Sequence, residues 1–170
     1  MSVVVIKIET DKISVSSDSG CYQGYGVLPT KNMTTSKLEK INNTILGGVG
    51  SAEETQLFFD YMKTHVIDIA DREHIRNFLK EFQDYKEGLG LSKDLNNTYI
   101  LATNGRGFVI EGMFISEVKT FWAIGAGQDY ANGALYMGAT AEQAVEAART
   151  LCAFVGGEIK TEIIERERKI

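Results

Sequence analysis

The order of two hydrophobic periodicities limits the possible folds more than any single motif in this sequence. Apolar residues follow a strand-like period of two up to residue 50, helical spacing from 51 to 90, and strand-like spacing again from 98 to 124. Two further helical segments follow over 128–153, and a last strand-like run follows Gly156-Gly157. Two helix pairs separated by antiparallel hairpins predict an α+β fold, a four-layer α/β/β/α sandwich of two antiparallel sheets. We expect a single domain over residues 1–170, with a charged tail from about residue 165.

Short local signals mark the expected turns and helix starts. Asn104-Gly105, between TYILAT and GFVIEGMF, is the strongest hairpin signal in the chain. The pairs Ser51/Glu54 and Thr140/Gln143 have the spacing of capping boxes and predict two helix N-termini. Helical spacing predicts that Val66 belongs to the first helix, and that Leu151 belongs to the buried stripe of the last helix.

Composition and charge exclude several classes of function. The net charge is −5 over 170 residues, and no run of lysine or arginine predicts binding to nucleic acid. No apolar segment approaches the roughly 18 residues that span a membrane, and the N-terminus does not have the pattern of a signal peptide. Cys21 and Cys152 lie far apart in sequence, which favours a reduced, cytoplasmic protein. His65 and His74 have no zinc-site spacing and are expected on helix surfaces, so no cofactor is predicted and any metal is unknown.

The stretch from Phe121 to Ala148 raises the possibility of a phosphate-binding turn between a strand and a helix. Its glycines at Gly125, Gly127 and Gly133 form G-x-G-x5-G, which differs from the dinucleotide-binding pattern, and no P-loop lysine follows. A nucleotide site is therefore disfavoured. The simpler interpretation is a turn in which glycine allows two backbone segments to approach closely.

An ordered set of motifs over nearly the whole chain resembles proteasome β-type subunits and bacterial HslV-type peptidases, which are N-terminal nucleophile hydrolases. In the N-terminal half these motifs are an apolar strand from Ser2, an aspartate ending the second strand, K-L-x-x-I from Lys37, and I-x-G-x-x-G from Ile45. In the C-terminal half they are the glycine turn, a helix of small residues, a helix opening at Thr140, and Gly156-Gly157 before the last strand. The resemblance implies the same four-layer fold.

The resemblance also implies roles for four residues. Ser2 would be the nucleophile once Met1 is removed, and its α-amine would act as the base, because a hydroxyl needs a base beside it. Lys37 would tune the electrostatics, Asp18 would hold Lys37, and the backbone N–H of Gly47 would bind the developing oxyanion. Each residue also has a plain structural interpretation: a strand terminus for Ser2, a turn for Asp18, a solvated lysine for Lys37 and a packing glycine for Gly47.

Three departures from the family pattern weaken the expected activity. The serine of the family's G-S-G turn is Ala126 here, which removes a hydroxyl that assists proton transfer at the terminal amine. Cys152 and Val155 stand where proteasome subunits often carry Asp and Ser. The nucleophile is serine rather than threonine and lacks the methyl group that restricts the rotamer.

Three functions therefore remain open at this stage. The first is a peptidase subunit of a homo-oligomeric ring or double ring, which cleaves unfolded protein or peptide delivered by an AAA+ ATPase. The second is a catalytically weak or inactive ring protein that serves as an assembly module. The third is an N-terminal-nucleophile amidase that acts on a small amide. Substrate pockets are expected partly in the irregular segment 20–34.

Overall fold

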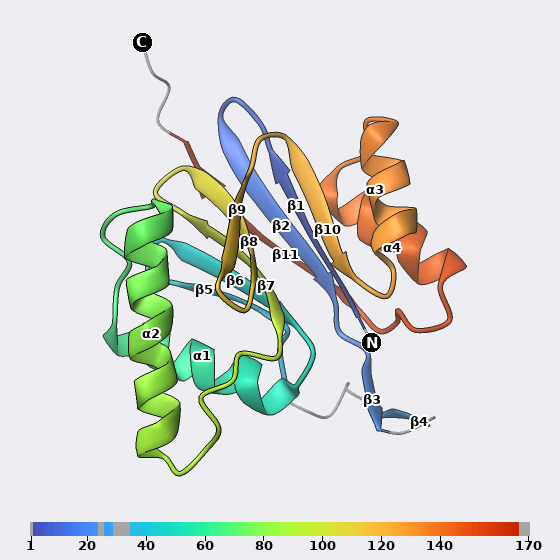
Figure 1. Cartoon of the computed structure of the whole chain (residues 1–170). Helices are drawn as coiled ribbons and strands as arrows, with labels where there is room; N and C mark the ends of the chain where they lie inside the picture. Colours follow the sequence, from blue (N-terminus) through green and yellow to red (C-terminus); the bar gives the residue numbers. More distant parts are fainter. Residues whose placement is uncertain (1, 24–25, 29–34, 167–170) are drawn as a thin grey trace.

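The structure is a computed structural model that describes residues 2–23, 26–28 and 35–166. Two antiparallel sheets pack face to face, and a pair of helices covers the outer face of each sheet (Figure 1). The predicted α+β four-layer sandwich is therefore confirmed.

The first sheet has four strands in the order β10-β1-β2-β11, so the N-terminal strand lies in its interior. Its outer face is covered by two helices that bury small side chains, among them Ala131, Ala144 and Ala148, against β1. The elements of this half are β1 (Val3–Ile8), β2 (Lys12–Asp18), β10 (Phe121–Gly125), β11 (Ile159–Glu165), α3 (Gln128–Tyr136) and α4 (Ala141–Leu151).

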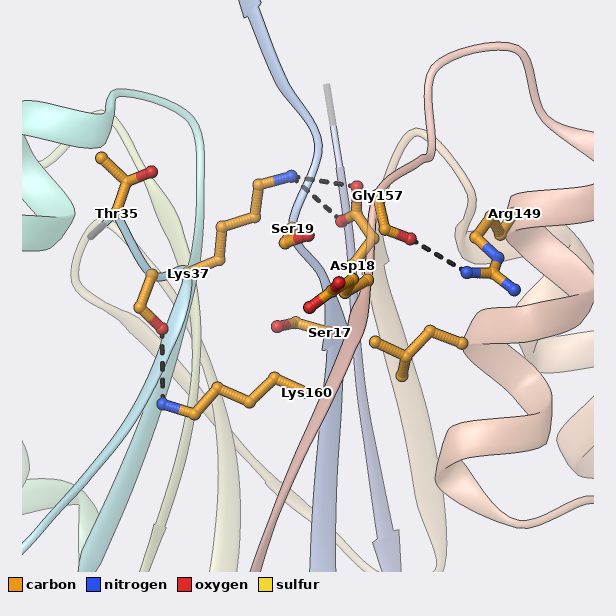
Figure 2. A pocket seen from close by; sticks show the side chains of 11 residues that line it. Ser17, Asp18, Ser19, Thr35, Lys37, Arg149, Gly157 and Lys160 are labelled. Atoms are coloured by element: carbon orange, nitrogen blue, oxygen red, sulfur yellow. Dashed lines mark hydrogen bonds and ion pairs between the residues drawn. The ribbon is translucent and has the colours of Figure 1, made fainter. Parts of the chain in front are cut away.

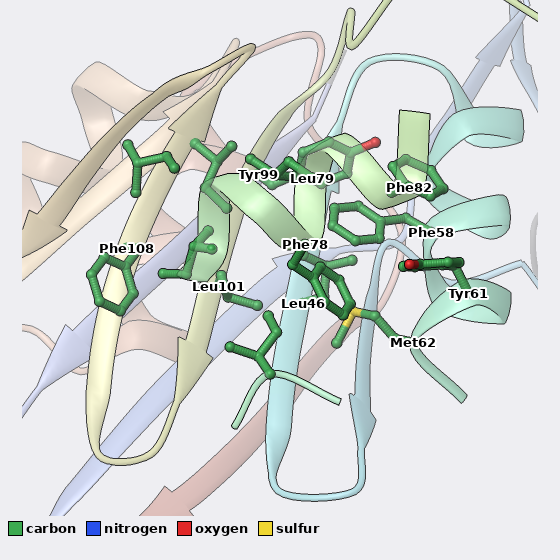
Figure 3. Packing of buried hydrophobic residues seen from close by; sticks show 14 of the residues in the cluster. Leu46, Phe58, Tyr61, Met62, Phe78, Leu79, Phe82, Tyr99, Leu101 and Phe108 are labelled. Carbon is green, nitrogen blue, oxygen red and sulfur yellow. The ribbon is translucent and has the colours of Figure 1, made fainter. Parts of the chain in front are cut away.

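The second sheet has five strands in the order β5-β6-β7-β8-β9, each paired with the next along the chain. Its outer face packs on two helices through a cluster of large aromatic side chains, including Phe58, Phe82 and Tyr99 (Figure 3). The elements of this half are β5 (Leu38–Ile41), β6 (Thr44–Val49), β7 (Thr98–Thr103), β8 (Arg106–Glu111), β9 (Phe114–Val118), α1 (Ala52–Thr64) and α2 (Arg72–Gly88). A separate short hairpin joins β3 (Cys21–Gln23) to β4 (Gly26–Leu28).

Aliphatic side chains fill the space between the two sheets. Val4 and Ile6 of β1 and Ile13 and Val15 of β2 meet β5, β6 and β7 there. Residues on β1 alternate between this inner core and the helix-covered outer face, where Val3 and Val5 lie. Burial on both faces explains why β1 reads as a continuous apolar run rather than an alternating one.

Several expectations about individual elements need correction. The segment GFVIEGMF is not one strand, because Gly112, with φ +55°, turns the chain between β8 and β9. Helix α1 ends at Thr64, which leaves Val66 exposed beyond it, and Leu151 is exposed at the end of α4. Arg166 of the expected solvated tail donates hydrogen bonds to the carbonyl oxygens of Glu9 and Gly105. Residues 167–170 lie outside the described residues.

The two predicted capping boxes differ in outcome. At α4, Thr140 and Gln143 form both reciprocal hydrogen bonds of the box. At α1, the Ser51 hydroxyl accepts a hydrogen bond from the Glu54 N–H, but the Ser51 N–H donates to Asn97 Oδ1 instead of the Glu54 side chain. The Glu54 carboxylate instead accepts hydrogen bonds from the Asn97 N–H and the Tyr99 hydroxyl.

Candidate active site

Ser2 lies at the start of a fully paired interior strand. The residue is 5% exposed, and the next residue, Val3, pairs with Gly125 of β10. The Ser2 carbonyl accepts a hydrogen bond of 3.4 Å from the Gly127 N–H at the start of α3. The backbone of Ser2 is therefore held by the glycine turn that the sequence singled out.

Asp18 ends β2 on the other side of β1. Its side chain is buried and accepts two backbone hydrogen bonds, one from the Val3 N–H to Oδ1 at 2.9 Å and one from the Gly156 N–H to Oδ2 at 3.2 Å. The Val3 N–H belongs to the peptide bond that follows Ser2. The predicted aspartate thus holds the backbone of the candidate nucleophile directly.

Lys37 reaches Asp18 from the opposite sheet, just before β5. Its Nζ lies 3.1 Å from Asp18 Oδ1 and 3.0 Å from Oδ2, and its side chain is 14% exposed (Figure 2). Lys40 is directed elsewhere and donates to the carbonyl oxygen of Ile163. The structure therefore places Asp18 between Lys37 and the backbone that follows Ser2.

A cavity of about 870 Å³ opens next to this ion pair. Hydroxyl side chains of Ser17, Ser19 and Thr35 line it, together with the cationic side chains of Lys37, Arg149 and Lys160 (Figure 2). Arg149 donates to the Gly157 carbonyl, and Lys160 donates to the Leu38 carbonyl. The cavity offers an open, polar approach to the Asp18 end of the site.

Tyr22 is a residue near the site that sequence reasoning missed. Its pKa is raised above the ordinary value by partial burial and by the negative charge of Asp18. The hydroxyl lies 3.5 Å from the position that a Cβ on Gly156 would take. Tyr22 belongs to β3, which directly follows the Asp18 turn, but no sequence pattern distinguishes it from other tyrosines. Residues 24–25 and 29–34 of the segment where substrate pockets were expected lie outside the described residues.

The structure does not bring Gly47 to Ser2. A Cβ on Gly47 would lie 2.6 Å from Val4 Cγ1, so Gly47 packs between the two sheets, two residues further along β1 than Ser2. The Gly48 N–H donates to the Lys37 carbonyl on the β5 side, so the Gly47 N–H points the other way, toward Ile100 of β7. This position matches the packing interpretation of Gly47 and gives no support to its predicted oxyanion role.

The glycine turn around Ala126 acts as a packing device. Gly125 has φ +98°, and a Cβ there would overlap the Ser2 carbonyl oxygen. A Cβ on Gly127 would lie 2.8 Å from both Ala148 Cβ and Val155 Cγ2. Ala126 itself is exposed, and its carbonyl accepts a weak hydrogen bond from the thiol of Cys152 at 3.6 Å. These contacts agree with a close-approach turn rather than a nucleotide site.

Neither a metal centre nor a membrane span is found in the part of the chain that the structure describes. Over residues 2–23, 26–28 and 35–166, no group of three or more His, Cys, Asp or Glu side chains could hold a metal ion. His65 and His74 are both exposed, as expected. Among these residues no helix is long and apolar enough to cross a membrane.

Solved structures with the same fold cover almost the whole chain. BPH from Thiobacillus denitrificans, in complex with epoxomicin, has a TM-score of 0.87 at 18% identity over 97% of this chain and 99% of that chain. Eukaryotic HslV from Trypanosoma brucei has a TM-score of 0.75 at 17% identity, covering 96% of this chain and 99% of that chain. Anbu, an ancestral β-subunit from Yersinia bercovieri, has a TM-score of 0.72 at 13% identity, covering 97% and 81% respectively.

The sequence comparisons add nothing to this likeness. No protein-family model matches the chain, and no curated protein matches it significantly. The structural neighbours nevertheless confirm the predicted resemblance to proteasome β-type and HslV-type subunits at the level of the fold.

Proposed function

We propose that this chain is a proteasome-like, HslV-like peptidase subunit that uses Ser2 as an N-terminal nucleophile. The observation that carries the proposal is the Asp18 carboxylate, which binds both the Val3 N–H next to Ser2 and the Lys37 ammonium. This buried carboxylate therefore fixes the Lys37 cation beside the backbone that follows Ser2. The likeness to BPH, HslV and Anbu supports the same assignment.

The proposed chemistry begins with removal of Met1, which lies outside the described residues, because only then does Ser2 carry a free amine. An α-amine has a pKa of about 7.7–8.0, so a fraction is neutral near pH 7 and accepts the proton of the Ser2 hydroxyl. The Lys37 cation favours the neutral amine by charge repulsion, while Asp18 holds Lys37 in place. Attack by Oγ on a peptide carbonyl gives a tetrahedral intermediate, and the protonated amine donates its proton to the leaving amine as the C–N bond breaks. The resulting acyl-enzyme is then hydrolysed by water, with the same α-amine as the base.

The oxyanion donor needs a different assignment from Gly47. The end of β6 lies nearer to Ser2, because Val49 Cγ2 is 3.2 Å from the position of a Cβ on Gly125, which also touches the Ser2 carbonyl. We therefore propose that the backbone N–H of Val49 or Gly50 binds the oxyanion, since the Ser51 N–H is donated to Asn97 Oδ1. Such a donor typically contributes about 3–4 kcal/mol to the transition state.

The assembly and its partners follow from the same proposal. A homo-oligomeric ring or double ring would restrict cleavage to unfolded protein or peptide that enters it, with an AAA+ ATPase as the feeding partner in the cytoplasm. Ala126 favours one second candidate, a catalytically weak or inactive ring protein. Its methyl group offers no hydroxyl at the turn, where the Ala126 carbonyl accepts a weak hydrogen bond from the Cys152 thiol.

An epoxyketone peptide tests the proposal, because it forms its ring adduct only with a terminal amine and the adjacent hydroxyl. The intact mass of the purified protein is measured before and after treatment, for the wild type and for Ser2→Ala. We expect a chain without Met1 that gains one adduct, and no adduct for Ser2→Ala. A chain that keeps Met1 and gains no adduct would favour the inactive ring protein. Cleavage of a small amide but of no unfolded protein would favour the amidase.

A further inference from the structure

A buried polar network lies where β6 passes into α1, and the proposed chemistry does not use it. At its centre is Asn97, which is 2% exposed and immediately precedes β7. Its Oδ1 accepts the Ser51 N–H at 2.6 Å, and its Nδ2 donates to the Ser51 carbonyl at 2.8 Å and to Thr55 Oγ1 at 2.9 Å. One side chain therefore binds both backbone groups of Ser51, the N-cap residue of α1.

The residue before Ser51 is adapted to this side chain. Gly50 has φ +135°, a conformation that side-chain-bearing residues rarely adopt. A Cβ on Gly50 would overlap Asn97 Oδ1. The missing side chain of Gly50 thus makes room for the Asn97 amide, so the two residues form one junction.

Asn97 is itself held by a buried carboxylate. Glu54 Oε1 accepts the Asn97 N–H at 3.1 Å and the Tyr99 hydroxyl at 2.9 Å, while Oε2 lies 3.0 Å from Lys86 Nζ. Burial raises the pKa of Glu54, but hydrogen bonds from Lys86, Tyr99 and the backbone of residues 96 and 97 outweigh it and hold the pKa below its ordinary value. The carboxylate stays charged, and this keeps Asn97 in one position.

The junction leads directly to the candidate active site. Val49 Cγ2 lies 3.2 Å from the position of a Cβ on Gly125, in the turn that packs on the Ser2 carbonyl, and the Gly48 N–H donates to the carbonyl of Lys37 at 2.9 Å. The last residues of β6 therefore lie between the turn beside Ser2 and the backbone of Lys37. A shift of the end of β6 therefore changes the position of the Ser2 backbone relative to Lys37.

We propose that Asn97 is a positioning residue for the Ser2 centre, acting through the Gly50-Ser51 junction and the end of β6. The proposal rests on the proposed function, because it assigns a purpose to the geometry around Ser2. It differs from a purely structural role in what it predicts for reactivity. A displacement of about 1 Å at a reacting centre costs about 100-fold in rate. A substitution that lowers the free energy of unfolding without moving the reacting groups leaves the rate of the folded protein unchanged.

Three variants separate positioning from stability. Asn97→Ala removes the clamp, and Thr55→Val removes one of its three hydrogen-bond partners in case Asn97→Ala does not fold. Leu79→Ala, in the fully buried aromatic layer of α2, is the control, because it destabilises the same half of the molecule without touching the junction. All are compared at a temperature where unfolding measurements show each to be folded.

The first readout is hydrogen–deuterium exchange, which needs no catalytic activity. We expect the amides of residues 3–5 and 49–52 to exchange about 10-fold faster in Asn97→Ala than its loss of unfolding free energy accounts for, by a smaller factor in Thr55→Val, and no faster than that loss accounts for in Leu79→Ala. Unchanged exchange at residues 3–5 in both Asn97→Ala and Thr55→Val overturns the proposal. This holds even if the wild type gives no epoxyketone adduct and the proposed function fails.

The second readout is the rate of epoxyketone adduct formation. We expect a reduction of about 10- to 100-fold in Asn97→Ala, a smaller reduction in Thr55→Val, and a change within about twofold in Leu79→Ala. Equal reductions in Asn97→Ala and Leu79→Ala would show that the network serves stability alone and would overturn the proposal.

Discussion

Replacing Asp18 by asparagine tests the centre of the site through stability. The carboxylate is 1% exposed and serves three donors: the Lys37 ammonium, the Val3 N–H and the Gly156 N–H. The amide keeps the shape but loses the charge, and its single acceptor oxygen leaves at least one backbone N–H unpaired. Removing one partner of a buried ion pair costs about 3–5 kcal/mol. We take the lower half of that range because Lys37 is partly exposed and can turn toward the cavity.

A loss of about 3–4 kcal/mol corresponds to a fall in Tm of roughly 6–16 °C for a chain of this size. Urea unfolding and thermal unfolding of Asp18→Asn measure it. The control is Asp60→Asn, which breaks an exposed pair with Lys63 on α1 and is expected to give no measurable change. A wild-type Tm for Asp18→Asn would refute the argument that this ion pair is buried and structurally required.

Three further predictions address other parts of the fold. Because the pKa of Glu54 is lowered by folding, its contribution to stability is present above its unfolded pKa and is lost as the pH falls through the folded value. Urea unfolding between pH 6 and pH 3.5 should therefore show a shallower pH dependence for Glu54→Gln than for the wild type, and parallel curves would contradict this. Gly127→Ala should lower the free energy of unfolding by about 1–3 kcal/mol, because its Cβ would crowd α4. Gly133→Ala on the same helix meets open space and should stabilise the protein by up to about 1 kcal/mol, so equal effects would refute the packing argument. Ala126→Ser restores a hydroxyl at the turn and should raise the rate of epoxyketone adduct formation; an unchanged rate would show that the missing hydroxyl does not limit the chemistry.

The layers of the fold could be predicted because they depend on local signals. Changes of hydrophobic period placed the helix pairs, and Asn104-Gly105 placed the hairpin between β7 and β8. The turn at Gly112 was missed, since a single glycine within an apolar run does not by itself interrupt a strand pattern. Leu151 was misplaced because helical spacing gives the face of a residue but does not show where the covering sheet ends.

The site was predictable only in part, for a similar reason. Ser2, Asp18 and Lys37 were predicted from the resemblance to proteasome-type subunits, and Asp18 contacts both Lys37 and the backbone that follows Ser2. The oxyanion role of Gly47 found no support, because the direction of a strand N–H depends on how the strand is paired in the sheet. A sequence motif does not fix that pairing. Asn97 and Glu54 lie 43 positions apart, and no sequence pattern links a buried amide to a buried carboxylate at that separation.

Tandem mass spectrometry of the epoxyketone-treated protein tests the central claim most directly, because it identifies both the first residue and the modified residue. The account predicts an N-terminal peptide that begins at Ser2 and carries the adduct on Ser2 itself. An N-terminal peptide that begins at Met1, or an adduct located on Cys152 instead, would contradict the claim that Ser2 is the nucleophile.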